Sequence, residues 1–193
     1  LSKMSIDIGE RLDTLVGDIY KISGSEFNIN STQQLAVILF DELKLSQIKK
    51  RSTAENILKE LAKEHDLPEL ILEYRKLNKL KNTYIDVLPI SMNKETKRIH
   101  STFNQTIAAT GRLSSTNPNF QNIPIRTEEG REIRKSFTAQ QKGWKILSAD
   151  YSQIELRVMA HLSEDIELCK AFNNNIDIHS RTASLIYNVS LDD

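Results

Sequence analysis

The sequence predicts an α+β protein in which a helical first part is followed by a small sheet with flanking helices. Apolar residues recur at helical spacing in successive stretches as far as residue 84, which is typical of amphipathic helices. Residues 98–107 alternate and are rich in β-branched side chains, which is typical of a strand. A short apolar run, 144–149, precedes a further helical pattern and indicates another strand. A chain of 193 residues can bury a sizeable core, in one domain or two small ones.

Start and stop signals divide the first part into helices. The first helix is expected over residues 1–20, with Gly24 ending the segment. Capping boxes at Ser31–Gln34 and Ser52–Glu55 predict the starts of the second and third helices, because each places a Ser three residues before a Gln or Glu. Pro68 fits the first turn of a fourth helix.

The second part is predicted to begin with a hairpin, in which the turn-like residues 91–96 precede the alternating stretch 98–107. No linker rich in Gly, Ser or Pro separates the helical part from the sheet, so the two are expected to pack as neighbouring subdomains. The run 144–149 is expected to be a strand buried on at least one face, followed by a helix over 154–162. Ser163–Asp165 is expected to cap another helix.

Asp150 stands where the predicted strand breaks into the predicted helix, and it is the first candidate for chemistry. Its carboxylate would project beyond the carboxyl end of a buried strand, where α/β architectures tend to place ligands. Glu155, in the first turns of the helix, would overhang the same cavity. The alternative is that Asp150 only caps the helix, since Asp before an apolar-periodic run is an ordinary start signal.

Charge is distributed unevenly along a chain that is neutral overall. Residues 44–112 carry 14 Lys and Arg against 8 Asp and Glu, whereas residues 148–193 carry 3 against 8. A basic middle suits a phosphate backbone, and an acidic segment after it suits divalent cations. The alternative is solvated helix faces with ordinary i,i+4 ion pairs.

Composition is that of a soluble globular protein, at 39% hydrophobic and 27% charged residues. We find no run long enough to cross a membrane and no recognisable signal peptide. The single Cys169 excludes an internal disulfide, which fits a reducing cytoplasm, and it is expected to be a packed residue and not a nucleophile.

Two long uninterrupted strings carry a resemblance to a known family. DYSQIELRVMAHLS, which begins at Asp150, resembles motif A of the family A DNA polymerases, the bacterial DNA polymerase I type. TGRLSSTNPNFQNIPIR, residues 110–126, resembles that family's other long signature, and lesser similarity covers nearly all of the chain. The resemblance implies a thumb at 1–92, the first part of a palm at 93–163 and the start of the fingers at 164–193.

The resemblance also implies an activity and its partners. The chain is expected to be a fragment of a template-directed DNA polymerase that transfers dNMP to a primer 3′ end with Mg²⁺, in DNA replication or repair. The implied partners are primer-template DNA and dNTP, with no membrane and no obligate protein partner, in the cytoplasm.

By resemblance, the residues around Asp150 serve catalysis and nucleotide binding. Asp150 would bridge two Mg²⁺ ions, and the backbone carbonyl of Tyr151 would help to hold one of them. Glu155 would pack against the 2′ position of the bound sugar and exclude a ribose hydroxyl by a clash. Gln153 would help to order the site, and His179 would reach the incoming triphosphate. Without the resemblance, a lone His in this setting is more often a surface or packing residue.

The resemblance implies that a first group of DNA contacts lies on the fourth helix. Residues 67–86, LPELILEYRKLNKLKNTYID, resemble the thumb helix that grips the duplex product. Arg75, Lys79 and Thr83 would contact the backbone, since long cations on an exposed helix neutralise phosphates without reading sequence. For Lys76 a solvated position remains open.

A second group of implied DNA contacts lies in residues 110–126, which hold few large apolar side chains and many hydrogen-bonding groups. Every correct base pair presents minor-groove acceptors, so donors in this segment would sense pair shape without sequence preference. Arg112 is implied at the primer-terminal pair. The implied contacts along the template and duplex are Asn119, Gln121, Asn122 and Arg126.

The chain departs from the family pattern, and other interpretations stay open. The family's Arg-x-x-x-Lys-x-x-x-x-x-x-Tyr fingers helix and its His-Asp-Glu motif, with the second catalytic Asp, do not occur in these residues. The chain alone is therefore expected not to polymerise. One alternative is a single-subunit RNA polymerase, but those enzymes typically carry a small residue where Glu155 stands, so the sequence argues against it. A second alternative is a non-catalytic primer-template DNA-binding module that kept the thumb and lost the site, and the presence of both Asp150 and Glu155 counts against it. A third is a two-metal nuclease, which explains neither the thumb-like helices nor the segment around Arg112.

Overall fold

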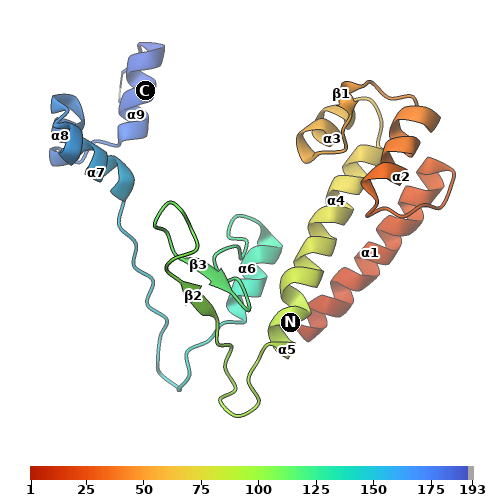
Figure 1. Cartoon of the computed structure of the whole chain (residues 1–193), viewed down its shortest axis with the longest axis horizontal. Helices are drawn as coiled ribbons and strands as arrows, with labels where there is room; N and C mark the ends of the chain where they lie inside the picture. The colour runs from red at the N-terminus through yellow and green to blue at the C-terminus, as the bar shows by residue number, and fades with distance from the viewer. Residues whose placement is uncertain (191–193) are drawn as a thin grey trace. The chain divides into compact units, whose positions relative to one another are not determined.

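The computed structural model describes residues 1–190 (Figure 1). The chain divides into two compact units, Leu1–Thr138 and Ala139–Asp193. The elements of the first unit are α1 (Ser2–Ser23), α2 (Thr32–Val37), the π-helix η1 (Ile38–Glu42), β1 (Ile48–Arg51), α3 (Glu55–Leu61), α4 (Leu67–Leu80), the π-helix η2 (Lys81–Ile85), α5 (Val87–Ile90), β2 (Thr102–Asn104), β3 (Ser114–Thr116) and α6 (Glu128–Lys135). Those of the second unit are α7 (Ile154–Ser163), α8 (Ile166–Asn173) and α9 (Ile178–Tyr187). The predicted α+β class is confirmed.

The boundary between the two units falls after Thr138 and not at residue 92 or 163. This division does not test the thumb, palm and fingers boundaries expected from the sequence, which stay predictions. The last residues of the expected fingers segment, 191–193, lie outside the described residues.

Helices α1 and α4 lie side by side in the first unit (Figure 1). The buried cluster to which both contribute includes Ile8, Leu12, Leu15, Leu77 and Leu80. Because these residues recur every three or four positions in each helix, each helix buries one face. The first predicted helix is confirmed, and Gly24 closes it at φ 74°, a left-handed conformation that favours glycine. The fourth helix begins at Leu67–Pro68 as predicted, and η2 extends its path past residue 84.

A second buried cluster forms around α2, η1 and α3. Its members include Leu35, Leu39, Leu58, Leu61 and Ile71, which are fully buried. The predicted start of the second helix is confirmed, because the Ser31 hydroxyl accepts a hydrogen bond from the backbone N of Gln34 at 3.3 Å. The other half of the predicted capping box is wrong. The Gln34 side chain accepts from the backbone N of Asn28, at 2.7 Å, and not from that of Ser31.

The predicted capping box at Ser52–Glu55 is wrong. Helix α3 begins at Glu55, its N-cap is Ala54, and no side chain caps it. The Ser52 hydroxyl accepts from the backbone N of Ala54, only two residues on, so it stabilises a turn before the helix. The turn holds Thr53, which is buried.

The predicted hairpin is present but short. Met92 pairs with Ile99 across the turn, and β2 pairs with β3 in antiparallel register, with Phe103 opposite Ser115. The strand expected over 98–107 keeps only the three residues of β2 in the ladder. Pro118 follows β3 closely and has no N–H to donate, so the ladder does not grow toward residue 100.

Helix α6 is an element that our sequence analysis does not predict. The Thr127 hydroxyl caps it by accepting from the backbone N of Gly130 at 3.1 Å, and Ile133 buries its side chain completely. Arg134 in the last turn donates to the carbonyls of Ile123 and Pro124, each at 3.2 Å. The helix therefore fastens the end of the 110–126 segment.

Gly130 has no room for a side chain, because a Cβ there would lie 2.7 Å from both the Cβ and the carbonyl oxygen of Pro124. We expect Gly130→Ala to destabilise the chain by about 1–3 kcal/mol, since the backbone must shift to admit a methyl group. Gly17 in α1 is the matched control, because nothing lies within 4 Å of its added Cβ. Gly17→Ala should stabilise by about 0.5–1 kcal/mol. Urea unfolding midpoints measure both, and an unchanged midpoint for Gly130→Ala contradicts the contact.

In the second unit, the strand predicted over 144–149 is wrong. This segment has no regular secondary structure, and Trp144, Ile146 and Leu147 are 59%, 63% and 90% exposed. A strand needs a partner for its backbone N–H and C=O groups, and none of the described strands pairs with this segment. The helices that follow are confirmed, including the cap by Asp165 at the start of α8. Cys169 is half-buried, and its thiol donates to the Ala160 carbonyl at 3.4 Å.

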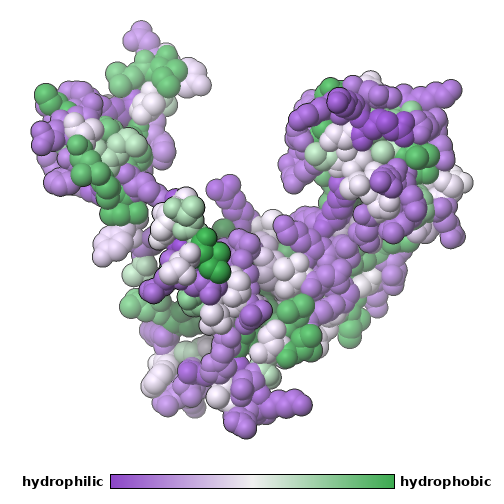
Figure 2. Space-filling view, viewed as in Figure 1, coloured by the Kyte–Doolittle hydropathy of each residue, from purple (hydrophilic) through white to green (hydrophobic). Residues whose placement is uncertain are grey.

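Large apolar side chains are common on the surface of the second unit. They include Tyr151, Val158, Met159, Leu162, Ile166, Leu185, Ile186 and Tyr187. Apolar residues are visible on this unit in the space-filling view (Figure 2). Within residues 1–190, no helix is long and apolar enough to span a bilayer.

Candidate functional site

Helix α4 and η2 carry the first group of candidate residues. Lys79 and Thr83 are exposed, as a duplex contact requires. Lys76 forms an ion pair with Glu129 of α6, with 3.0 Å between Nζ and Oε1, so part of its charge is neutralised within the unit. The hydrogen bond from Lys59 is the main cause of the lowered pKa of Glu55, and the charge of Lys79 lowers it further.

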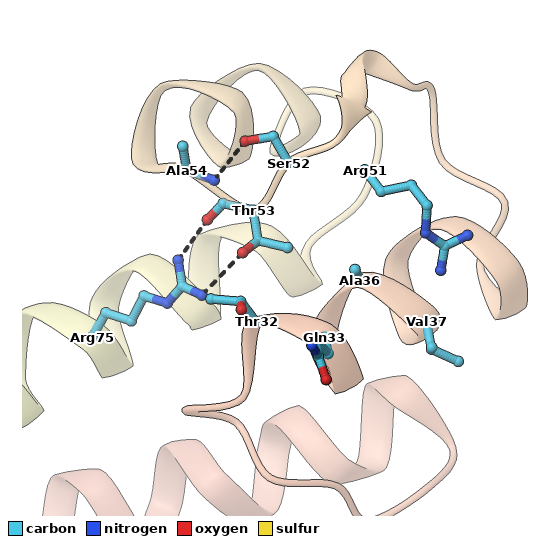
Figure 3. Close-up of a pocket in the computed structure, with 9 residues that line it drawn as sticks. All are labelled: Thr32, Gln33, Ala36, Val37, Arg51, Ser52, Thr53, Ala54 and Arg75. Carbon is cyan, nitrogen blue, oxygen red and sulfur yellow. Dashed lines mark hydrogen bonds between the residues drawn. The ribbon is translucent and has the colours of Figure 1, made fainter.

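Arg75 differs from these neighbours, because its guanidinium turns toward the turn before α3 (Figure 3). Nη1 donates to the Thr53 carbonyl at 2.6 Å, and Nη2 lies 3.5 Å from the Thr53 hydroxyl. Burial lowers the pKa of Arg75. The side chain therefore holds the turn against α4, a role that the sequence does not predict. Its implied contact with DNA stays a prediction.

Arg75 also lines two cavities of the first unit. One, of about 810 Å³, is lined by Thr32, Gln33, Ala36, Val37, Arg51, Ser52, Thr53, Ala54 and Arg75 (Figure 3). The other, of about 650 Å³, has walls from α3, α4, η2 and the 110–126 segment with the residue that follows it. Its lining includes the predicted DNA contacts Arg75, Lys79 and Asn122, together with the carboxylates Glu55, Glu69 and Glu73.

The 110–126 segment is held in place by hydrogen bonds between side chains and its backbone. The hydroxyl of Tyr84, from η2, donates to the carbonyl of Asn122. The buried hydroxyl of Ser115 accepts from the backbone N of Phe120 at 3.0 Å. Two other elements thus anchor a segment that has little regular structure, η2 through Tyr84 and α6 through Arg134, and Ser115 stabilises the segment from within.

The residues of this segment that are implied to contact DNA differ in the hydrogen bonds that their side chains form within the protein. Arg112, Asn119, Asn122 and Arg126 are exposed, which fits a contact with DNA. The side-chain amide of Gln121 is also exposed but donates to the Leu113 carbonyl at 2.9 Å, so this N–H stabilises the segment itself. The Asn119 side chain accepts from the backbone N of Gln121 at 2.9 Å.

In the second unit, Asp150 and Tyr151 lie exposed in the extended chain that leads into α7. The alternative that Asp150 caps this helix is wrong, because the N-cap is Gln153 and no side chain caps it. Glu155 lies in the first turn of α7, as predicted, and its side chain is exposed. Asp150 does not end a buried strand, so the predicted reason for its projection away from the core is wrong.

Gln153 and His179 are brought together through a residue that our sequence analysis does not single out. The Gln153 side-chain amide donates to Oδ1 of Asp177 at 3.0 Å, and Asp177 caps α9, which carries His179 in its first turn. Hydrogen bonds from Ser180 are the main cause of the lowered pKa of Asp177, with further contributions from Gln153 and His179. Asp before an apolar-periodic stretch is a start signal and could have revealed the cap, but not the bond to Gln153.

The oxygen atoms of Asp150 and Tyr151 are of the type that binds a divalent cation, but they are too few to form a complete site. A carboxylate and a backbone carbonyl are hard oxygen ligands of the type that Mg²⁺ prefers. Within residues 1–190, however, no group of three or more His, Cys, Asp or Glu side chains lies close enough to hold a metal ion. The predicted metal-binding role of Asp150 and Tyr151 stays a prediction.

Comparisons with known proteins agree on one family. The family model described as DNA polymerase family A matches residues 1–193. The chain is 50% identical over 198 residues to the DNA polymerase I of Bacillus caldotenax, covering 100% of this chain and 23% of that protein. It is 49% identical over 199 residues to the DNA polymerase I of Pseudomonas aeruginosa, covering 100% and 22%. The chain thus spans less than a quarter of either relative.

A solved structure agrees with these relatives. The POL domain of Pol1 from M. smegmatis, in complex with DNA primer-template and dNTP, matches with a TM-score of 0.89 and 41% identity. The match covers 100% of this chain and 35% of that chain.

Proposed function

This chain belongs to DNA polymerase family A, and we propose on that premise that it forms the duplex-gripping helices and part of the nucleotide-transfer site of a template-directed DNA polymerase. The observation that carries the proposal is the exposed Asp150, in an extended segment that runs into a helix with Glu155 in its first turn. Similarity to a polymerase domain bound to primer-template and dNTP supports it. The reaction transfers dNMP to a primer 3′ end, in replication or repair.

On the DNA side, the cavity bounded by α3, α4, η2 and the 110–126 segment supports a duplex contact. Lys79 and Thr83 bind backbone phosphates, and Arg75 sets the turn at Thr53 in addition to any phosphate contact. Arg112 lies at the primer-terminal pair, while Asn119, Gln121, Asn122 and Arg126 follow the template and duplex. The anchors at Tyr84 and Arg134 hold the segment that carries these donors against η2 and α6.

On the nucleotide side, the Asp150 carboxylate and the Tyr151 carbonyl would hold Mg²⁺, with the remaining ligands supplied from outside these residues. When bound, Mg²⁺ neutralises the charge that develops on the phosphoryl group and lowers the pKa of the primer hydroxyl. Glu155 occupies the space that a 2′-hydroxyl would need. Gln153 orders the turn before α7, and His179 binds the triphosphate.

The finer parts of the proposal follow the same premise. We assign residues 1–92 to a thumb, 93–163 to the first part of a palm and 164–193 to the start of the fingers, and we place the protein in the cytoplasm. A single-subunit RNA polymerase is disfavoured by Glu155, and a non-catalytic DNA-binding module by the presence of both Asp150 and Glu155. A two-metal nuclease leaves the helices and cavity of the first unit unexplained.

The function is tested with a chimaera, in which this chain replaces the aligned residues of the Bacillus caldotenax polymerase. We expect the chimaera to extend a primer on a template with Mg²⁺ and dNTP. The 193-residue chain alone should bind primer-template DNA without extending it. A folded chimaera that binds DNA and does not extend primers contradicts the proposal, and so does extension by the chain alone.

The different environments of Lys79 and Arg75 predict different effects on DNA binding by the chain. Lys79→Ala should reduce the slope of log affinity against log salt concentration by about 1, because one phosphate contact is lost. It should leave amide hydrogen exchange unchanged in the turn at residues 52–54. Arg75→Ala should accelerate exchange in that turn, since the bonds to Thr53 are removed. Equal exchange in both variants contradicts the holding role of Arg75.

A further inference from the structure

Asp177 engages two helices of the second unit with one carboxylate. Oδ2 accepts from the backbone N of Ser180 at 2.7 Å and from its hydroxyl at 2.9 Å, which together cap α9. Oδ1 accepts from the side-chain amide of Gln153, 24 residues earlier, at 3.0 Å. A capping residue needs only the first set of bonds. The bond to Gln153 links the cap of α9 to the turn that begins α7.

The turn at Gln153 is one that needs outside support. Gln153 has φ 52° and ψ 42°, a left-handed conformation that is uncommon for a residue with a side chain. It is the N-cap of α7 but supplies no capping side chain, because its amide points to Asp177. On the other side, Arg157 holds the turn by donating from Nε to the Ser152 carbonyl at 2.9 Å. Asp177 and Arg157 thus restrain the turn from α9 and from α7.

We propose that Asp177 is a positioning residue for nucleotide transfer, which sets the turn after Asp150 and the first turn of α9 at a fixed spacing. This inference rests on the proposed function, because Asp150 is three residues before Gln153 and His179 is two residues after Asp177. The carboxylate touches neither the metal nor the nucleotide. It fixes the distance between Asp150, which we assign to Mg²⁺, and His179, which we assign to the triphosphate. Small misplacements of such groups have large effects on rate, of order 10²-fold for about 1 Å.

Two variants separate this role from that of an ordinary helix cap. Asp177→Ser keeps a capping oxygen for α9, since Ser is a good N-cap, but removes the oxygen that reaches Gln153. Gln153→Glu places a second carboxylate against Asp177. Adding Asp177→Asn to Gln153→Glu restores the bond with donor and acceptor exchanged, because Asn still caps the helix through its oxygen.

The first measurement uses the 193-residue chain and needs no activity. Asp177→Ser should leave the helix content unchanged and accelerate hydrogen exchange of the Arg157 amide about fivefold, as expected for the loss of one restraining hydrogen bond. This amide donates to the Gln153 carbonyl and therefore reports on the turn. Gln153→Glu should behave in the same way, and the double variant should return to within about twofold of the wild type. An unchanged rate in Asp177→Ser overturns the proposal.

The second measurement uses the chimaera with the Bacillus caldotenax polymerase. Asp177→Ser should raise KM for dNTP about tenfold with unchanged affinity for primer-template, and the Gln153→Glu, Asp177→Asn pair should recover most of the loss of Gln153→Glu. A wild-type KM in Asp177→Ser, or no recovery in the pair, overturns the positioning role. An inactive wild-type chimaera instead contradicts the proposed function. In that case, the exchange rates of the chain still test whether Asp177 restrains the turn at Gln153.

Discussion

Replacing Asp150 by Asn in the chimaera is expected to lower the rate of primer extension at saturating dNTP by about 10³-fold. An amide offers one neutral oxygen, and its nitrogen cannot bind a cation, so the variant loses the negative charge and the second oxygen of the ligand that we assign to Mg²⁺. Single-turnover extension by rapid quench measures the effect on the chemical step. Affinity for primer-template should stay within about twofold, since in this proposal Asp150 does not contact the duplex.

The control for Asp150→Asn is Glu164→Gln. Glu164 is also exposed, lies in the same unit and ends α7, so the substitution removes the same charge without touching the proposed site. Its extension rate should remain near that of the wild type. Because the Asp150 side chain is exposed and caps no helix, Asp150→Asn should also leave the unfolding midpoint unchanged. An undiminished extension rate with Asn at position 150 removes the basis of the proposed mechanism.

The sequence predicts the helices of this chain well because their signals are local. Spacing of apolar residues, Gly24 at the end of α1 and Pro68 at the start of α4 each act within a few residues. Helix α6 escapes prediction although Thr127 and Ile133 are both present, since Ile133 is the one large apolar residue among its eight and a single residue shows no periodicity. Its position is set instead by the close approach of Gly130 to Pro124.

The sheet could be predicted only in part, because strands depend on partners distant in the sequence. The run 144–149 has the composition of a buried strand, yet none of the described residues pairs with it. The hairpin strand is shortened for a related reason, since Pro118 on its partner removes a donor. Alternation indicates that a segment can pair, but its length in the ladder is decided by the other strand.

The candidate site was predicted as a set of residues but not as a set of contacts. Motif strings identify Gln153, His179 and Arg75, and they do not indicate that Asp177 links the first two or that Thr53 engages the third. These bonds join residues 22 or 24 positions apart, beyond the reach of any helical or strand period. Long-range bonds of this kind therefore appear only in the folded structure, whereas residues proposed to act on substrate can be identified in the sequence.

Replacing Glu155 by Ala in the chimaera is expected to lower its preference for dNTP over rNTP by about 10- to 200-fold. In this proposal Glu155 excludes the ribose 2′-hydroxyl by occupying its space, so a methyl group leaves room for the hydroxyl. The ratio of kcat/KM for dNTP and rNTP, measured at one template position, gives the change directly. Most of it should come from a higher kcat/KM for rNTP, because the block is removed and no contact with dNTP is gained.

Glu155→Gln separates steric exclusion from charge. Gln has nearly the same size as Glu, so a steric block should keep the preference for dNTP within a few-fold of the wild type. If Glu155→Gln loses as much preference as Glu155→Ala, the carboxylate acts through its charge or a hydrogen bond and the steric account is wrong. The loss of an acidic residue from the first turn of α7 is common to both variants and costs about 0.3–1 kcal/mol of helix stability, so it cannot produce a difference between them. A difference in nucleotide preference between Ala and Gln therefore reports the volume of the side chain at position 155.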